Sequence, residues 1–158
     1  MPVFVLDPAQ RRFIEARRTA TLATLSKGGL PRLVPICFVV LDAPGESPHP
    51  VLYSPLDEKP KRDRDVRRLA RALDIAERPG VTLLFERWSE DWSQLAWLRA
   101  RGEAALVEAP DDGDDAHRRA VLALRVKYPQ YAEHDLERRP MIRIVLGAVL
   151  SWSASDDV

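Results

Sequence analysis

The sequence predicts an α+β protein, mainly β, whose six antiparallel strands form a small barrel with flanking helices. The predicted order of elements is helix, three strands, helix, two strands, helix, strand, which is not the strict alternation of a doubly wound parallel sheet. Closing six strands into a barrel would remove the exposed edges of a flat sheet. At 158 residues, we expect one domain spanning residues 1–158.

The first elements are a helix and a hairpin. Asp7 before Pro8 is typical of a helix start, and residues 8–18 then have an apolar side. Residues 19–25 and 30–41 are rich in β-branched and aliphatic side chains, with two glycines between them that can take positive φ. We expect a hairpin whose second strand is long.

The remaining elements follow from proline and glycine density and from apolar spacing. Residues 42–50 predict a loop, and residues 51–54 a brief strand. Val66, Leu69, Ala70 and Leu73 have helical spacing and predict one helix of about three turns that ends before Pro79. Further strands are expected at residues 81–87, 95–109 and 141–153, and a helix at 116–128.

Charge and cysteine content restrict the class of protein. The 24 basic and 24 acidic residues cancel, so no global field attracts nucleic acid or an anionic membrane. No segment approaches the roughly 20 apolar residues of a membrane span. Cys37 is the only cysteine, which excludes an internal disulfide and is typical of a reducing compartment. We expect a cytoplasmic protein with neither a nucleic-acid nor a membrane partner.

Several kinds of catalytic site lack their motifs. His49, His117 and His134 do not fall in a metal-ligand pattern, so we expect no metal site. The sequence also has no nucleophile elbow, no phosphate loop and no dinucleotide-binding turn. No side chain is identified as catalytic from the sequence.

A possible anion site remains near the middle of the chain. The segment "YSPLDEKPKR" supplies a hydroxyl at Ser54 and cations at Lys59, Lys61 and Arg62 before the next helix, a combination that suits a phosphate. Arg32, at a strand start, could point at the same anion. The residues alone leave another interpretation open, a solvated turn whose acids and bases neutralise one another.

The four tryptophans at positions 88, 92, 97 and 152 also allow two interpretations. An indole can stack on an aromatic ligand, but a tryptophan on a strand equally serves a core or a subunit interface.

Four segments carry a resemblance to a known family. The chain resembles the pyridoxamine 5′-phosphate oxidase-like split β-barrel superfamily in the order and spacing of "TATLATLSKGGLPRLVPICFVV", "LYSPLDEKPK", "WLRARGEAALV" and "IRIVLGAVLSW". The resemblance extends from about Phe13 to Trp152. Within the superfamily it is closest to the branch described as deazaflavin (coenzyme F420)-dependent.

This resemblance implies a homodimer with two equivalent cofactor sites at the subunit interface. It implies that the second strand lines the ring and polar tail of the cofactor, that an aromatic and hydroxyl pair follows, that a basic turn holds the phosphate, and that a tryptophan approaches the ring. The residues at the corresponding positions are Arg32, Val34, Pro35, Ile36, Tyr53, Ser54, Lys59, Lys61, Arg62 and Trp97.

Two departures concern the substrate. The basic pair of pyridoxamine phosphate oxidases is adjacent, whereas Pro60 separates Lys59 from Lys61 here. The substrate-binding tail of those enzymes has no counterpart after Trp152. Both argue against pyridoxamine phosphate as the substrate.

The functional expectation is an F420-dependent oxidoreductase that transfers hydride between the deazaflavin and a small organic substrate, with bulk water or Tyr53 as the proton donor. The alternatives are an FMN-binding oxidoreductase of the same fold, a non-catalytic carrier of a flavin, haem or tetrapyrrole, and a structural dimer with an empty cleft.

Overall fold

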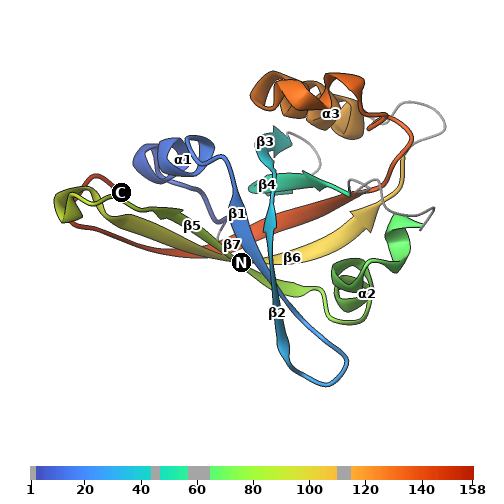
Figure 1. Ribbon diagram of the computed structural model, residues 1–158, viewed down its shortest axis with the longest axis horizontal. Coiled ribbons are helices and arrows are strands. Elements are labelled where there is room, and N and C mark those ends of the chain that lie inside the picture. The colour runs from blue at the N-terminus through green and yellow to red at the C-terminus, as the bar shows by residue number, and fades with distance from the viewer. Residues whose placement is uncertain (1–2, 44–46, 57–64, 110–114) are drawn as a thin grey trace.

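A seven-stranded antiparallel sheet forms the centre of the protein in a computed structural model that describes residues 3–43, 47–56, 65–109 and 115–158 (Figure 1). The strand order is β2-β1-β5-β6-β7-β4-β3. The strands are β1 (Ala20–Leu25), β2 (Pro31–Ile36), β3 (Val39–Ala43), β4 (Ser47–Pro55), β5 (Gly80–Arg87), β6 (Ala96–Val107) and β7 (Met141–Ser153). The helices are α1 (Pro8–Glu15), α2 (Ala70–Glu77) and α3 (Asp115–Lys127), with 3-10 turns η1 (Val66–Arg68), η2 (Trp92–Gln94) and η3 (Pro129–Glu133).

The prediction of a mainly β, antiparallel fold with three α-helices is confirmed, but the six-stranded barrel was wrong. The sheet has seven strands and does not close, because β2 and β3 lie at its opposite edges. The predicted strand over residues 30–41 is interrupted at Cys37 and Phe38. Before the interruption Ile36 lies opposite Ala20 in β1, and after it Val39 lies opposite Tyr53 in β4. The chain therefore passes from one edge of the sheet to the other at this point.

The hydroxyl of Tyr128 holds the interruption between β2 and β3. It accepts a hydrogen bond from the backbone N–H of Phe38 at 3.0 Å. The same hydroxyl lies within donating distance of two carbonyl oxygens, 2.9 Å from that of Arg18 and 3.1 Å from that of Phe38. Phe38 is fully buried, so its backbone groups need a partner within the protein.

The helices differ in how well their patterns predicted them. The expected start of α1 is confirmed, because Asp7 and Gln10 each accept a hydrogen bond from the backbone N–H of the other. The single helix expected from Val66 is instead η1 followed by α2, with extended backbone at Leu69. The predicted apolar face was also wrong at Leu73, which is 56% exposed. No helix in the described ranges has the length and apolar character that a membrane crossing needs.

Two apolar clusters occupy opposite faces of the sheet. On β4, Leu52 belongs to one cluster while Val51 and Tyr53 belong to the other, as expected when successive side chains point to opposite faces. The first cluster includes side chains of α1 and α2, and we call its side the inner face. The second lies beneath α3, which covers β3 and β4 in Figure 1, and we call its side the outer face.

A bulge bends the long pair formed by β6 and β7. Arg101 lies opposite Ala148 but the next residue, Gly102, lies opposite Leu146, so Gly147 is the extra residue. A Cβ atom on Gly102 would lie 2.6 Å from the carbonyl oxygen of Val145. A Cβ atom on Gly147 would meet nothing within 4 Å. Only the first glycine is therefore required by close packing.

We expect the substitution Gly102→Ala to lower the free energy of unfolding by about 1–3 kcal/mol, because the added methyl group can be accommodated only if the backbone of β7 shifts. Urea unfolding measures this change. Gly147→Ala is the matched control in the same bulge and should change the unfolding free energy by less than about 0.5 kcal/mol. Equal effects of the two substitutions would contradict the geometry of the bulge.

Candidate functional site

The open edge of β2 is the first element of the candidate site. β2 ends the strand order, so only one of its sides pairs with another strand. Pro31 and Pro35 have no backbone N–H, and proline is accommodated in a sheet where that position faces away from the neighbouring strand. Backbone groups alternate in direction along an antiparallel pair. Leu33, midway between the prolines, therefore has both its N–H and its C=O at the open edge.

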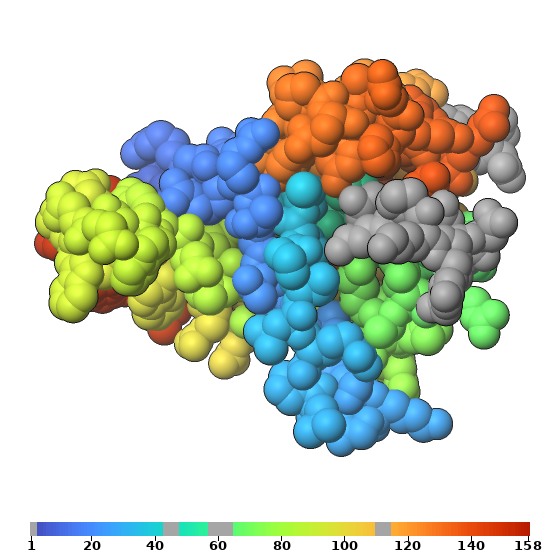
Figure 2. Space-filling view, in the orientation of Figure 1, coloured from blue at the N-terminus to red at the C-terminus, as the bar shows by residue number. Residues whose placement is uncertain are grey.

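The side chains of β2 become more buried along the strand. Arg32 is exposed, Val34 half-buried and Ile36 buried, and all three point to the inner face, since Ile36 belongs to the inner cluster and side chains alternate. β2 and β3 follow one another across the surface toward α3 in the space-filling view (Figure 2). The strand that the resemblance assigns to the cofactor is thus accessible from Pro31 to Pro35 and buried at Ile36.

Arg32 is already engaged by an acid on α2. Its Nε donates to the Asp74 carboxylate at 2.9 Å, and the Thr24 hydroxyl donates to the same oxygen at 2.7 Å. The Asp74 side chain is 7% exposed, whereas that of Arg32 is 46% exposed. The ion pair fixes the inner end of the guanidinium and leaves the rest of the group at the surface of β2.

The environment of Asp74 keeps it ionised. Burial by itself would raise the pKa of the carboxyl, but hydrogen bonds from Thr24 and Arg32, together with the charges of two nearby arginines, outweigh burial and hold the pKa below its usual value. An ionised Asp74 is the acceptor that Arg32 and Thr24 both require.

Tyr53 and Ser54 do not form one contact surface. Both are buried, but Tyr53 lies on the outer face beneath α3 and Ser54 on the inner face, since adjacent residues of β4 point in opposite directions. Only Ser54 therefore shares a face with Arg32 and Ile36. The roles that the resemblance assigns to the two residues remain predictions.

Pro35 and Trp97 lie together on the part of the outer face that α3 does not cover. Strand register places Pro35 in a row across the sheet with Thr21, Leu84, Arg99 and Leu150, and the next row contains Trp97 beside Trp152. This uncovered face is accessible and of mixed character, because Arg99 and Arg101 are exposed on it beside the apolar side chains. Its most exposed apolar side chains are Leu33 at 67%, Leu150 at 54% and Trp152 at 46%.

A hollow of about 1020 Å³ crosses the sheet, and its lining includes Val81 and Leu146 of the inner cluster. Its floor crosses β1, β5, β6 and β7 and includes Thr82 and Arg101, and Leu25 and Pro31 lie toward its β2 end. Gly80 and Gly147 leave bare backbone there, because a Cβ atom on either would meet only open space. The volume and the apolar lining with a few polar groups are typical of small-molecule sites.

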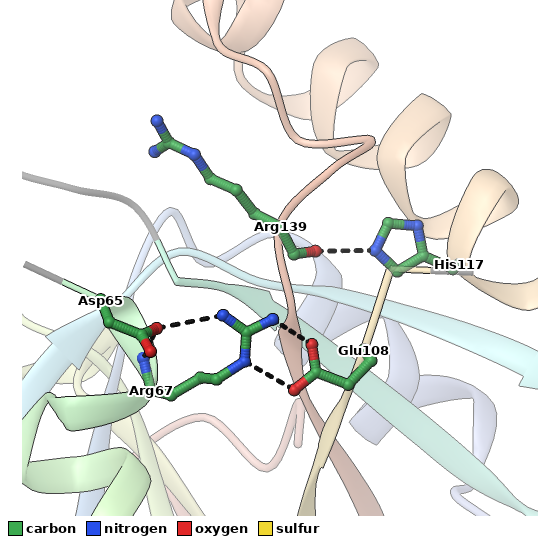
Figure 3. A network of polar contacts seen from close by, with 5 residues as sticks. All are labelled: Asp65, Arg67, Glu108, His117 and Arg139. Carbon is green, nitrogen blue, oxygen red and sulfur yellow. Dashed lines mark hydrogen bonds and ion pairs between the residues drawn. The ribbon is translucent and has the colours of Figure 1, made fainter. Parts of the chain in front are cut away.

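Lys59, Lys61 and Arg62 lie outside the described residues, so their role as a phosphate grip remains a prediction. The backbone resumes at Asp65, which caps η1 by accepting from the N–H of Arg67 at 3.0 Å. The Arg67 guanidinium bonds to both Asp65 and Glu108, and His117 bonds to the carbonyl oxygen of Arg139 nearby (Figure 3). Arg67 is therefore neutralised by two carboxylates at the exit of the expected basic turn.

Leu33, Thr24 and Asp74 were not predicted as site residues from the sequence. Leu33 could have been found from the two prolines that flank it two residues away, since prolines mark an edge strand. Asp74 lies between Leu73 and Ile75. The helix was predicted from the spacing of Val66, Leu69, Ala70 and Leu73, which placed the apolar face at Leu73 rather than at Ile75. In the described ranges, no group of three or more His, Cys, Asp or Glu side chains is arranged to hold a metal ion.

Comparison with known proteins adds a family and a fold. The family model described as Pyridoxamine 5′-phosphate oxidase matches residues 6–153. The conserved hypothetical protein Rv2991 from Mycobacterium tuberculosis has a similar structure, with a TM-score of 0.69, 22% identity, and coverage of 95% of this chain and 86% of that one. No curated protein matches the sequence significantly.

Two further similar structures are proteins whose names include a cofactor. One is described as F420 Reductase, with a TM-score of 0.59, 20% identity, and coverage of 92% of this chain and 98% of that one. The other is HutZ, the heme storage protein from Vibrio cholerae, with a TM-score of 0.60, 14% identity and 95% coverage of both chains. At these identities the likeness concerns the fold.

The ion pair on β2 leads to a prediction about pH. Asp74→Asn should lower the free energy of unfolding by about 1–3 kcal/mol at pH 7, because a charged acceptor is lost from Arg32 and Thr24. A carboxyl with a lowered pKa in the folded state stabilises the protein above its unfolded pKa of about 4 and loses that contribution as pH falls through the folded value. The difference between the wild type and Asp74→Asn should therefore shrink between pH 5 and pH 3.

Urea unfolding at several pH values measures the difference. Asp156→Asn is the control, because Asp156 is exposed and asparagine tolerates its positive φ of 56°. A difference for Asp74→Asn that stays constant between pH 7 and pH 3 would contradict the assigned ionisation.

Proposed function

Because the chain belongs to the pyridoxamine 5′-phosphate oxidase family, we propose that it is an oxidoreductase that binds the deazaflavin F420 and transfers hydride between that cofactor and a small organic substrate. The observation that carries the proposal is the open edge of β2. Leu33 offers one donor and one acceptor there, between two prolines that offer acceptors only. The Leu33 N–H and C=O can pair with one carbonyl and the adjacent N–H at the edge of a flavin or deazaflavin ring, and the second ring carbonyl needs a donor from another part of the site.

The residues of β2 and the turn after β4 would hold different parts of the cofactor. Val34, Pro35 and Ile36 would line the ring, and the exposed part of Arg32 would face the polar tail. Lys59, Lys61 and Arg62 would bind the phosphate by charge-assisted hydrogen bonds. Arg67 cannot replace them, because Asp65 and Glu108 already neutralise it.

The chemistry of the reaction belongs to the cofactor. When bound, such a cofactor supplies hydride chemistry, in which an electron-poor double bond is reduced as the cofactor is oxidised, and a proton from solvent completes the product. We assign the proton to solvent rather than to Tyr53, because Tyr53 is buried beneath α3. The protein orients the two partners and limits the access of water.

We also propose that the protein is a homodimer in which a second copy completes the site. The exposed apolar side chains of the uncovered outer face support this, since such side chains often mark a protein–protein contact. Leu150 and Trp152 are exposed on that face beside the half-buried Trp97, and Leu33 is exposed on β2. The second copy would bury the face, and Trp97 would approach the cofactor from the interface.

We also consider two alternative functions. An FMN-dependent enzyme would use the same phosphate grip and the same backbone edge. A non-catalytic carrier is supported by the likeness to HutZ, whose TM-score of 0.60 is about that of the F420 Reductase at 0.59. The choice of F420 rests on the resemblance of the sequence to the deazaflavin-dependent branch.

Titration of the purified protein with F420, FMN and haem tests the proposal. We expect F420 to bind at about micromolar concentration or tighter, detected by quenching of its fluorescence. Tighter binding of FMN would favour the FMN enzyme, and a stoichiometric shift of the haem absorption band would favour the carrier. If neither F420 nor FMN binds at micromolar concentration, the oxidoreductase proposal fails.

Two pairs of variants locate the site. Replacing both Lys59 and Lys61 by alanine should weaken F420 binding by about 2–5 kcal/mol, or about thirty-fold or more. The control is Lys27→Ala with Arg138→Ala, which removes the same charge elsewhere and should not weaken F420 binding.

Leu150→Asp should give a monomer that no longer binds F420. Leu122→Asp is its control, because Leu122 is equally exposed on α3. A wild-type monomer with full F420 affinity would contradict the dimeric site.

A further inference from the structure

Two charged side chains line the hollow without partners of their own. Arg101 and Glu103 both belong to β6, and both are exposed. Within the described ranges, neither side chain forms an ion pair or a hydrogen bond with another residue. Two residues along an antiparallel strand are about 6.8 Å apart. A cation and an anion therefore lie side by side in the hollow at that spacing, and each is left for a ligand.

The other polar side chains of the hollow are mostly engaged within the protein. The Thr24 hydroxyl donates to the Asp74 carboxylate at 2.7 Å, and His49 Nδ1 accepts from a backbone N–H at 3.1 Å. The half-buried Thr82 lies directly opposite Arg101 on β5, and its hydroxyl has no bond to any described residue. The lining thus offers a ligand a guanidinium, a carboxylate and a hydroxyl.

Small residues leave open space around the two charges. Glu103 lies opposite Gly80 on β5, and a Cβ atom on Gly80 would meet nothing within 4 Å. A Cβ atom on Gly147, which also lines the hollow, would meet nothing either. The apolar part of the lining includes Leu25, Pro31, Val81, Val145 and Leu146. The hollow therefore combines two unpaired opposite charges with room and with apolar surface, which is the pattern of a small-molecule site.

We propose that the hollow binds a small zwitterion with an apolar body, and that a hydrophobic dipeptide is the class of ligand that fits it. The Arg101 guanidinium pairs with the terminal carboxylate, and Glu103 accepts hydrogen bonds from the terminal ammonium group. An extended dipeptide spans about 7 Å at most, which matches the spacing of the two charges along β6. The Thr82 hydroxyl is left for the peptide group, and the apolar lining receives the side chains.

The dipeptide site and the proposed cofactor site use different parts of the molecule. The cofactor is assigned to β2 and to the turn after β4. The proposed dimer contact lies toward one end of the outer face, where Trp152 lies opposite Trp97 and Leu150 opposite Arg99. Arg101 lies farther along β6, away from the tryptophans. The proposal therefore goes beyond the function proposed above, and its test needs no cofactor.

Calorimetric titration of the full chain with leucylphenylalanine at pH 7 tests the proposal. We expect one dipeptide per chain, with a dissociation constant below about 1 mM. The N-acetylated peptide lacks the ammonium group and the peptide amide lacks the carboxylate, so each should bind about ten-fold more weakly or worse. Equal affinities of the three peptides, or no binding of leucylphenylalanine at about 1 mM, would overturn the proposal.

Matched variants assign each charge to one end of the peptide. Arg101→Gln should weaken binding of the free dipeptide by about ten-fold and remove its advantage over the amide, while Glu103→Gln should remove its advantage over the N-acetylated peptide. Arg99→Gln and Glu86→Gln are the controls, because both residues are exposed and neither belongs to the lining of the hollow. If Arg101→Gln and Arg99→Gln have the same effect, the assignment fails.

Filling the hollow provides a test that does not change charge. Gly80→Val places a side chain in open space beside Glu103, so it should leave the unfolding temperature unchanged and weaken dipeptide binding by about ten-fold or more. A folded Gly80→Val variant with the full affinity of the wild type would place the peptide outside the hollow and overturn the proposal.

Discussion

The hydroxyl of Tyr128 is the contact on which the arrangement of this sheet depends. A chain that leaves one edge of a sheet and joins the other must pass through residues with no strand on either side. Here those residues are Cys37 and Phe38. Phe38 is fully buried, and its N–H donates a hydrogen bond to the Tyr128 hydroxyl. The same oxygen also lies 2.9 Å from the carbonyl oxygen of Arg18. One side chain, directly after α3, therefore connects the segment before β1 to the interruption between β2 and β3. Without it, a buried donor would have no partner, at a cost of about 1–3 kcal/mol.

The interruption between β2 and β3, where the chain passes from one edge of the sheet to the other, determines which surfaces remain available for binding. Because the chain leaves β2 at Ile36, the far edge of β2 pairs with none of the described strands. Because the same tyrosine fixes α3 above β3 and β4, this helix covers only that part of the outer face (Figure 1). An unpaired strand edge thus lies beside a face of the sheet that α3 does not cover. A site completed by a second copy of the chain would use both surfaces.

The parts of the fold that could be predicted are those that local chemistry determines. The cap formed by Asp7 and Gln10 and most strand positions agree with their sequence patterns. The interruption at Cys37 could not be predicted, because "VPICFVVL" is uniformly apolar whether it crosses the sheet or continues a buried strand. Its cause lies 90 residues away, in Tyr128. Local patterns do not contain such a contact.

In the candidate site too, the residues found from local sequence patterns differ from those that tertiary contacts determine. Arg32 was identified from its place at the start of a strand, but its partner Asp74 was not, because the pairing of β2 with α2 is a tertiary contact. Lys59, Lys61 and Arg62 were identified from composition and resemblance, and they lie outside the described residues. The opposite directions of Tyr53 and Ser54 follow from strand alternation and could have been inferred once β4 was assigned.

The most direct test of the account is the rate at which the Cys37 thiol reacts with a disulfide reagent in Tyr128→Phe. Cys37 is the only cysteine and precedes Phe38, so its reactivity reports opening of the crossing. If the Tyr128 hydroxyl holds Phe38 in place, its removal speeds the reaction of the thiol and lowers the free energy of unfolding by about 1–3 kcal/mol. Tyr131→Phe, in the same cluster, should leave the thiol rate unchanged. A thiol rate and a stability in Tyr128→Phe equal to those of the wild type would contradict it.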